Sequence, residues 1–82
     1  MEDDYREVKT RQEVITQPYL NIRDIQILLK VSYGKAKKIY EEADGLQLKK
    51  FHDHKVSIKD VMKVTGINFS TLLKQIEYEK TA

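Results

Sequence analysis

A cluster of cationic side chains is the part of this 82-residue sequence with the clearest chemical potential. Guanidinium and ammonium groups donate hydrogen bonds to phosphate oxygens and to the edges of bases. The formal net charge of the whole chain is only +2, so the cluster is a local feature. It indicates a polyanionic partner or, as the simpler alternative, an ordinary solvated surface. Within residues 23–38, where Asp24 is the only acid, the bases are Arg23, Lys30, Lys35, Lys37 and Lys38.

Catalytic and metal chemistry find little support in the sequence. The chain has no cysteine, no phosphate-cradling loop and no recognisable nucleophile motif. Asp24 and Asp60 are better explained as helix-start residues than as a catalytic pair. His52 and His54 lack a third ligand nearby, and such a pair is more often part of a solvated turn than a metal site. We therefore expect no enzymatic activity, no bound metal and no cofactor.

The cationic cluster falls on a pattern that predicts two short helices joined by a tight turn. Asn21 is a favourable N-cap with Asp24 three residues on, so a first helix is expected over about 22–30. Ser32 is a second N-cap, and Gly34 is tolerated in the first turn of a new helix over about 33–43, which Gly45 should end. The apolar positions that match a helix-turn-helix are Ile22, Ile25, Leu29, Val31, Ala36 and Ile39.

The turn of this motif departs from the usual pattern at one position. Lys30 stands where glycine is common, so its backbone is expected to adopt a left-handed or otherwise altered conformation. Such a conformation costs about 1 kcal/mol for a residue with a side chain. A helical hairpin with a purely structural role is the alternative to a DNA-reading motif.

The next segment, "LQLKKFHDHKVSI", is interpreted as a β-hairpin wing or an extended connector over 46–58. A wing would place Lys49, Lys50 and Lys55 around a projecting edge. Beyond it, Ser57 should cap a helix that Gly66 ends, and Asn68 or Ser70 should cap a last helix. The buried side of that last helix is expected to carry Leu72, Leu73 and Ile76.

The second helical hairpin admits three interpretations. Residues 58–78 laid over residues 22–42 form a weak internal repeat, with Ile22, Asp24, Lys38 and Glu41 meeting identical residues. The stretch "VTGINFSTLLKQI" also resembles the helix-hairpin-helix motif, which presents backbone amides to phosphates, although Asn68 replaces its second glycine. The third interpretation is a packing hairpin that completes the core.

These patterns predict one mainly α-helical domain. Pro18 marks a boundary, so residues 1–17 are expected to form a loose arm or a short element, and residues 18–82 a single helix-turn-helix domain. About four short helices are expected, with the small β-hairpin wing as a further candidate element. No apolar run is long enough to span a membrane and no signal peptide opens the chain, which together favour a cytoplasmic location.

The run "PYLNIRDIQILLKVSYGKAKKIYEEA", followed by a basic connector and "KVSIKDVMKVTGI", resembles a known family. It is similar to small DNA-binding proteins of phages and integrative elements of Gram-positive bacteria, including excisionase-like proteins and prophage regulators. The resemblance covers about residues 18–67. It implies that the second helix enters the major groove of double-stranded DNA and that the connector touches the backbone.

Carried onto this chain, the resemblance implies a set of DNA-binding residues: Arg23, Ser32, Tyr33, Gly34, Lys35, Lys37, Lys38, Lys49, Lys50 and Lys55. The function expected is that of an excision factor or a regulator of transcription. The partners expected besides DNA are a second copy on the DNA or a protein such as a recombinase. The alternative is a small helical protein–protein adaptor or inhibitor that does not bind DNA.

Overall fold

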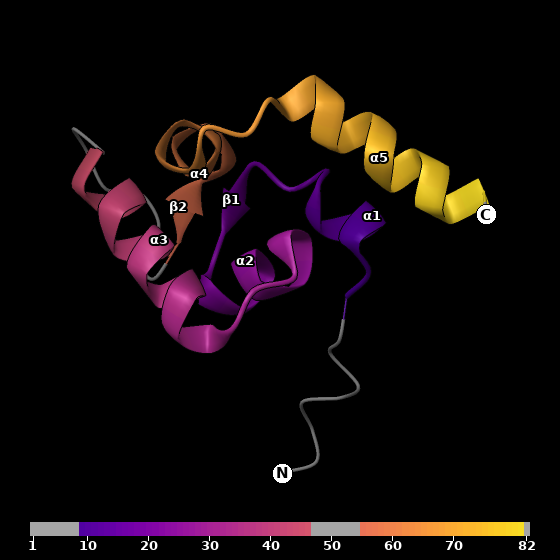
Figure 1. Cartoon of the computed structure of the whole chain (residues 1–82). Helices are drawn as coiled ribbons and strands as arrows, with labels where there is room; N and C mark the ends of the chain where they lie inside the picture. The colour runs from indigo at the N-terminus through magenta and orange to yellow at the C-terminus, as the bar shows by residue number, and fades with distance from the viewer. Residues whose placement is uncertain (1–8, 47–54, 82) are drawn as a thin grey trace, which may run out of the picture.

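The computed structural model describes residues 9–46 and 55–81, and over these residues the fold is mainly helical with one small antiparallel sheet (Figure 1). The mainly α fold class expected from the sequence is thereby confirmed. In chain order the elements are α1 (Arg11–Val14), β1 (Tyr19–Leu20), α2 (Ile22–Leu29), α3 (Tyr33–Leu46), β2 (Val56–Ser57), α4 (Ile58–Thr65) and α5 (Phe69–Thr81).

The predicted helix-turn-helix corresponds to α2 and α3. Asn21 caps α2 by accepting a hydrogen bond from the Asp24 amide at 2.7 Å, and the Asp24 carboxylate accepts one from the Asn21 amide at 3.2 Å. This reciprocal capping box satisfies two amides that have no partner inside the helix. Lys30 ends the helix at φ 56° and ψ 49°. This is the left-handed conformation that the turn requires and that glycine usually supplies at this position.

Helix α3 is longer than the sequence predicts. Gly45 was expected to end this helix near residue 43, but the helix continues through Gly45 to Leu46. A glycine costs about 1 kcal/mol in a helix interior. The burial of Ala43 in the core, where it is completely inaccessible, supports the last turns against that cost.

The small sheet joins two segments that lie far apart in the sequence. Strands β1 and β2 pair antiparallel, with Tyr19 opposite Ser57 and Leu20 opposite Val56. The strand at Val56 therefore pairs with a strand that precedes α2. Leu46, the first residue of the expected wing, is part of α3, and residues 47–54 lie outside the described residues.

Of the loose arm or short element expected for the N-terminal segment, its described residues form a short element, helix α1. Thr10 and Glu13 form a second capping box at the start of α1, with Thr10 Oγ1 3.2 Å from the Glu13 amide. Val14 is fully buried and Ile15 nearly so, and both belong to the hydrophobic core. Helix α1 packs against α2 and α5, so it joins the domain predicted for residues 18–82.

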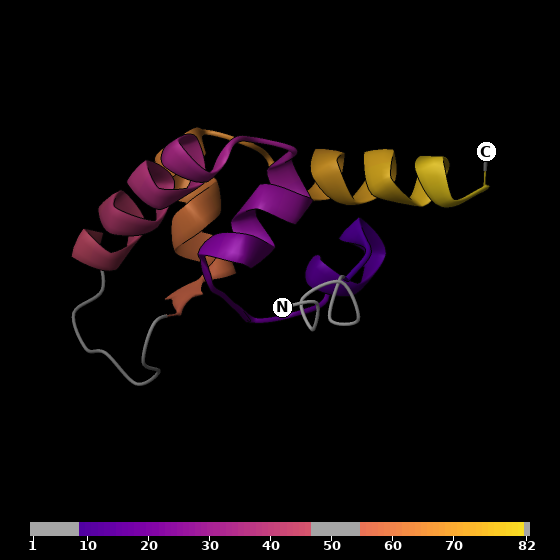
Figure 2. The same ribbon diagram turned by 90° about the horizontal axis from the view of Figure 1, so that it is seen from below.

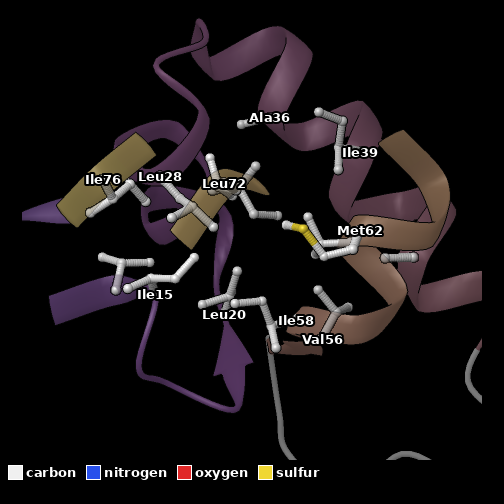
Figure 3. Packing of buried hydrophobic residues seen from close by; sticks show 14 residues of the cluster. Ile15, Leu20, Leu28, Ala36, Ile39, Val56, Ile58, Met62, Leu72 and Ile76 are labelled. Atoms are coloured by element: carbon white, nitrogen blue, oxygen red, sulfur yellow. The ribbon is translucent and has the colours of Figure 1, made fainter. Parts of the chain in front are cut away.

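One hydrophobic core connects all the elements (Figure 3). Apolar burial of this kind is the main driving force for folding, and it fixes which face of each helix remains outside. Leu72 and Ile76 bring α5 to the core, as expected, while Leu73 is half-buried. The buried members are Val14, Ile15, Leu20, Ile25, Leu28, Ala36, Ile39, Ala43, Val56, Ile58, Val61, Met62, Leu72 and Ile76.

The second helical hairpin forms at the predicted residues. Ser57 caps α4, accepting a hydrogen bond from the Lys59 amide at 3.1 Å. Gly66 ends α4 at φ 74°, in the left-handed region. Of the two candidate caps for α5, Asn68 is the one used: its side-chain oxygen accepts from the Thr71 amide at 3.0 Å.

Candidate nucleic-acid interface

Helix α3 turns one face into the core and presents its basic face to solvent. Ala36 and Ile39 are buried, while Lys35, Lys37 and Lys38 are exposed. The three lysines occupy the first turns, before the exposed Glu41 and Glu42. Positive charge is therefore concentrated near the start of the helix.

The start of α3 is fixed locally and is open to solvent. Ser32 Oγ accepts a hydrogen bond from the Lys35 amide at 3.3 Å, which holds the first turn. The side chain of Tyr33 is 56% exposed. A Cβ atom placed on Gly34 would meet no atom within 4 Å, so this point of the helix is free of neighbours.

The predicted binding residues on this helix divide between two sides. Tyr33 lines a shallow hollow of 280 Å³ together with Arg23, Tyr40, Asn21 and Ile22. Arg23, on the exposed start of α2, is thus brought next to Tyr33. The hollow belongs to the outer corner of the helix-turn-helix.

On its other side, α3 forms one wall of a groove of 750 Å³, and α5 forms the opposite wall. Lys35 and Lys38 stand on the α3 wall. Apolar side chains line the groove between the walls, among them Leu29, Val31, Ile39, Val64, Ile67 and Leu72. Lys35 and Lys38 therefore belong to a different surface from Arg23 and Tyr33, although one helix carries both pairs.

Of the three lysines expected in the wing, only Lys55 belongs to the described residues. Lys49 and Lys50 lie outside the described residues. Lys55 is exposed and directly precedes β2. Figure 2 shows β2 on the opposite side of the body from the start of α3, so Lys55 is separated from the basic turns of that helix.

Two cations that the predicted site omits, Arg11 and Lys30, also line the groove. The Arg11 side chain, only 13% exposed, donates from Nε to the Leu28 carbonyl at 2.8 Å and from Nη1 to the Glu79 carboxylate. Lys30 Nζ lies 3.9 Å from the same carboxylate. These contacts join α1, the turn after α2 and the far end of α5.

The sequence carries no local signal for the Arg11 network. Its partners Leu28 and Glu79 are 17 and 68 residues away along the chain. Lys30 was recognisable as part of the basic cluster, but only the fold places it beside the groove.

Asp24 is the only buried charged residue among those described, and its partners give it a structural role. Its carboxylate accepts a hydrogen bond from Gln17 Nε2 at 3.0 Å in addition to the bond from the Asn21 amide, and it lies 3.4 Å from Lys9 Nζ. These partners offset the cost of burying the charge.

The described residues contain no cluster of three or more His, Cys, Asp or Glu side chains that could hold a metal ion. His52 and His54 lie outside them. No helix in the described parts of the chain has the length and apolar character needed to span a membrane. Comparison with protein-family models, curated proteins and solved structures found no match.

Proposed function

We propose that this protein is a non-enzymatic DNA-binding protein that inserts the first turns of α3 into the major groove of double-stranded DNA. The observation that carries the proposal is the joint arrangement of Lys30 and α3. A left-handed turn joins α2 to a helix whose first exposed residues include three lysines and no acid. Recognition helices of helix-turn-helix proteins contact base edges with their N-terminal residues.

The side chains suit different parts of this task. Gly34 and Lys38 are one helical turn apart and share one side of α3, where the bare glycine lets DNA approach the helix closely. Lys35 and Lys37 flank that side and can reach phosphates or guanine edges. Arg23 and Tyr33 form the outer corner, where they can hold the backbone on one side of the helix.

The biological role we propose is that of an excision factor or transcriptional regulator of a phage or mobile element. This part of the proposal rests on the sequence resemblance over residues 18–67. A single short recognition helix reads few base pairs, so the protein is expected to act with a second copy on the DNA or with a protein such as a recombinase.

A salt-dependent mobility-shift titration on duplex DNA tests the proposal. Wild-type affinity should fall steeply with salt, and Lys38→Ala should flatten the log–log slope by about 0.9 if its ammonium meets a phosphate. If Lys38 reads a base, the loss should instead depend on DNA sequence, at about 1–3 kcal/mol. Lys38→Arg preserves the charge and should keep the non-specific slope.

Lys63→Ala is the matched control, because it removes one exposed lysine from α4, outside the predicted site. Lys35→Ala/Lys38→Ala should weaken binding most. Wild-type slope and affinity in that double variant would refute the role of α3.

The groove between α3 and α5 favours a second candidate function, that of a protein–protein adaptor. Its apolar lining, including Leu29, Ile39 and Leu72, is of the kind that accepts a helix of another protein. An adaptor that does not bind DNA would show no salt-dependent shift even at low ionic strength. That outcome would replace the DNA-binding proposal with this one.

A further inference from the structure

The α4–α5 hairpin shares helix starts, caps and a left-handed turn with the α2–α3 helix-turn-helix. Counterparts are separated by the same interval as Ile22 and Ile58, the first residues of α2 and α4. The helices α2 and α4 both have 8 residues. Lys30 and Gly66, the two left-handed residues, are counterparts.

The caps of the longer helices obey the same correspondence. Ser32 and Asn68 occupy equivalent positions, and each accepts a hydrogen bond from the amide three residues on. Tyr33 and Phe69, which begin α3 and α5, are also equivalent. The internal repeat suggested by the sequence therefore extends to caps, turn conformation and helix starts.

The strands that precede the two units are related by a local two-fold axis. Leu20 and Val56 are counterparts and also pair with each other in the sheet, as residues on such an axis must. The helices depart from this axis, because α3 packs closely against α2 whereas α5 runs away from α4 (Figure 1). Helix α1, which packs between α2 and α5, has no counterpart among the described residues and breaks the symmetry.

Surface features follow the repeat as well. The hollow formed by Ile22, Arg23 and Tyr33 has an equivalent formed by Ile58, Lys59 and Phe69. Both hollows place a cation beside an aromatic ring at the outer corner of a helical hairpin. The second hollow is lined in addition by Met62, the counterpart of Gln26, and is therefore more apolar.

The starts of α3 and α5 adjoin one another. Val31 and Ile67, which directly precede the caps of the two helices, line the same groove, as do Lys35 and Thr71 from their first turns. Figure 2 shows both helices leaving from the same side of the body. A rigid duplex that meets the start of α3 across the groove also comes near the start of α5.

We propose that α5 makes a second contact with the same DNA duplex, and that this contact is made to the sugar–phosphate backbone. The proposal rests on the function proposed for α3. The exposed residues of the first turns of α5 are Phe69, Ser70, Thr71, Lys74 and Gln75, with no acid before Glu77. The hydroxyl and ammonium groups among them are donors that commonly bind phosphate oxygens.

The difference between the units assigns them different tasks. Lys38 has the identical counterpart Lys74, but Lys35 and Lys37 correspond to Thr71 and the half-buried Leu73. The second unit thus keeps one of the three lysines. The α4–α5 unit has too few donors to contact several base edges. Helix α5 therefore binds the DNA backbone, while α3 makes the contacts to the bases.

The test compares Lys74→Ala, Thr71→Ala and the control Lys63→Ala in the full chain, by salt titration on duplex DNA. Lys74→Ala should flatten the log–log slope by about 0.9, as one lost phosphate contact does. Thr71→Ala should weaken binding about two- to tenfold without changing the slope, because a neutral donor releases no counterion. Lys63, the counterpart of Ile27, should leave the slope unchanged.

Hydroxyl-radical footprinting supplies a second readout. Wild type should protect the backbone at two places, and Lys74→Ala should lose only one of them. Unchanged slope, affinity and footprint in both α5 variants, with loss in Lys38→Ala, would overturn the second contact and leave the function of α3 standing. Absence of wild-type binding would overturn both, so the two failures are distinguishable.

The side chains of Lys74 and Thr71 are both exposed, so their replacement is not expected to unfold the protein. Thermal unfolding of Lys74→Ala and Thr71→Ala should match wild type, and a matched unfolding curve shows that any lost binding comes from lost contacts.

Discussion

Lys30 and Gly66 occupy equivalent left-handed positions in the two turns. Exchanging a residue with a Cβ atom for glycine at one position, and the reverse at the other, measures the conformational cost of the turn. Lys30 occupies the left-handed region at φ 56°, which costs a residue with a Cβ atom about 1–2 kcal/mol. Glycine does not have that cost, but its greater conformational entropy in the unfolded chain lowers the free energy of unfolding by about 0.5–1 kcal/mol. Lys30→Gly should therefore raise the free energy of unfolding by about 0.5–1 kcal/mol.

The ion pair that this change removes contributes little. Lys30 Nζ lies 3.9 Å from Glu79, and the Lys30 side chain is 66% exposed. Exposed pairs of this kind are worth about 0–1 kcal/mol. Lys30→Ala removes the same ion pair while keeping the backbone cost, so it isolates the contribution of the conformation.

Gly66→Ala is the opposite change at the equivalent position. A Cβ atom on Gly66 would meet nothing within 4 Å, so no clash adds to the conformational cost at φ 74°. This variant should lower the free energy of unfolding by about 0.5–1 kcal/mol.

Thermal and urea unfolding of the four proteins measures these differences. In a domain of this size 1 kcal/mol shifts the Tm by about 4–8 °C. The expected order of stability is Lys30→Gly above wild type, with Gly66→Ala below it. If Lys30→Gly were no more stable than Lys30→Ala, the assignment of strain to this turn would be refuted.

Three further changes test the contacts that hold the site together. Asp24→Ala removes a buried carboxylate from its capping box and its Gln17 hydrogen bond, and should cost about 1–3 kcal/mol in urea unfolding; a cost below 0.5 kcal/mol would contradict the packing described. Arg11→Ala should cost about 1–3 kcal/mol and lower the hydrogen-exchange protection of α5, whereas unchanged α5 protection would argue against the Glu79 link. Val14→Ala should cost about 2 kcal/mol by differential scanning calorimetry; a neutral result would mean that the N-terminal segment is not part of the core.

The helix boundaries were largely predictable because their causes are local. Asn21, Ser32 and Ser57 cap helices with bonds to amides two or three residues on. A residue type and its near neighbours are enough to identify such a bond. The end of α3 was missed because Gly45 has a local preference that the burial of Ala43 outweighs.

The exposed part of the candidate site was predictable for a similar reason. Helical periodicity places Lys35, Lys37 and Lys38 opposite Ala36, and the structure shows them exposed. Periodicity cannot tell which neighbouring element stands beside each lysine. The division between the hollow at Tyr33 and the groove at Lys35 follows from the positions of α2 and α5.

The sequence by itself determined the caps, the turns and the inward faces of the helices, since each depends on residues a few positions apart. Tertiary structure alone decided that β2 pairs with β1, that Val14 joins the core and that Arg11 bridges Leu28 and Glu79. These contacts join residues far apart in the chain, and many distant residues carry suitable apolar or charged groups. Which of them meet is set by the simultaneous burial of all the apolar faces in one core.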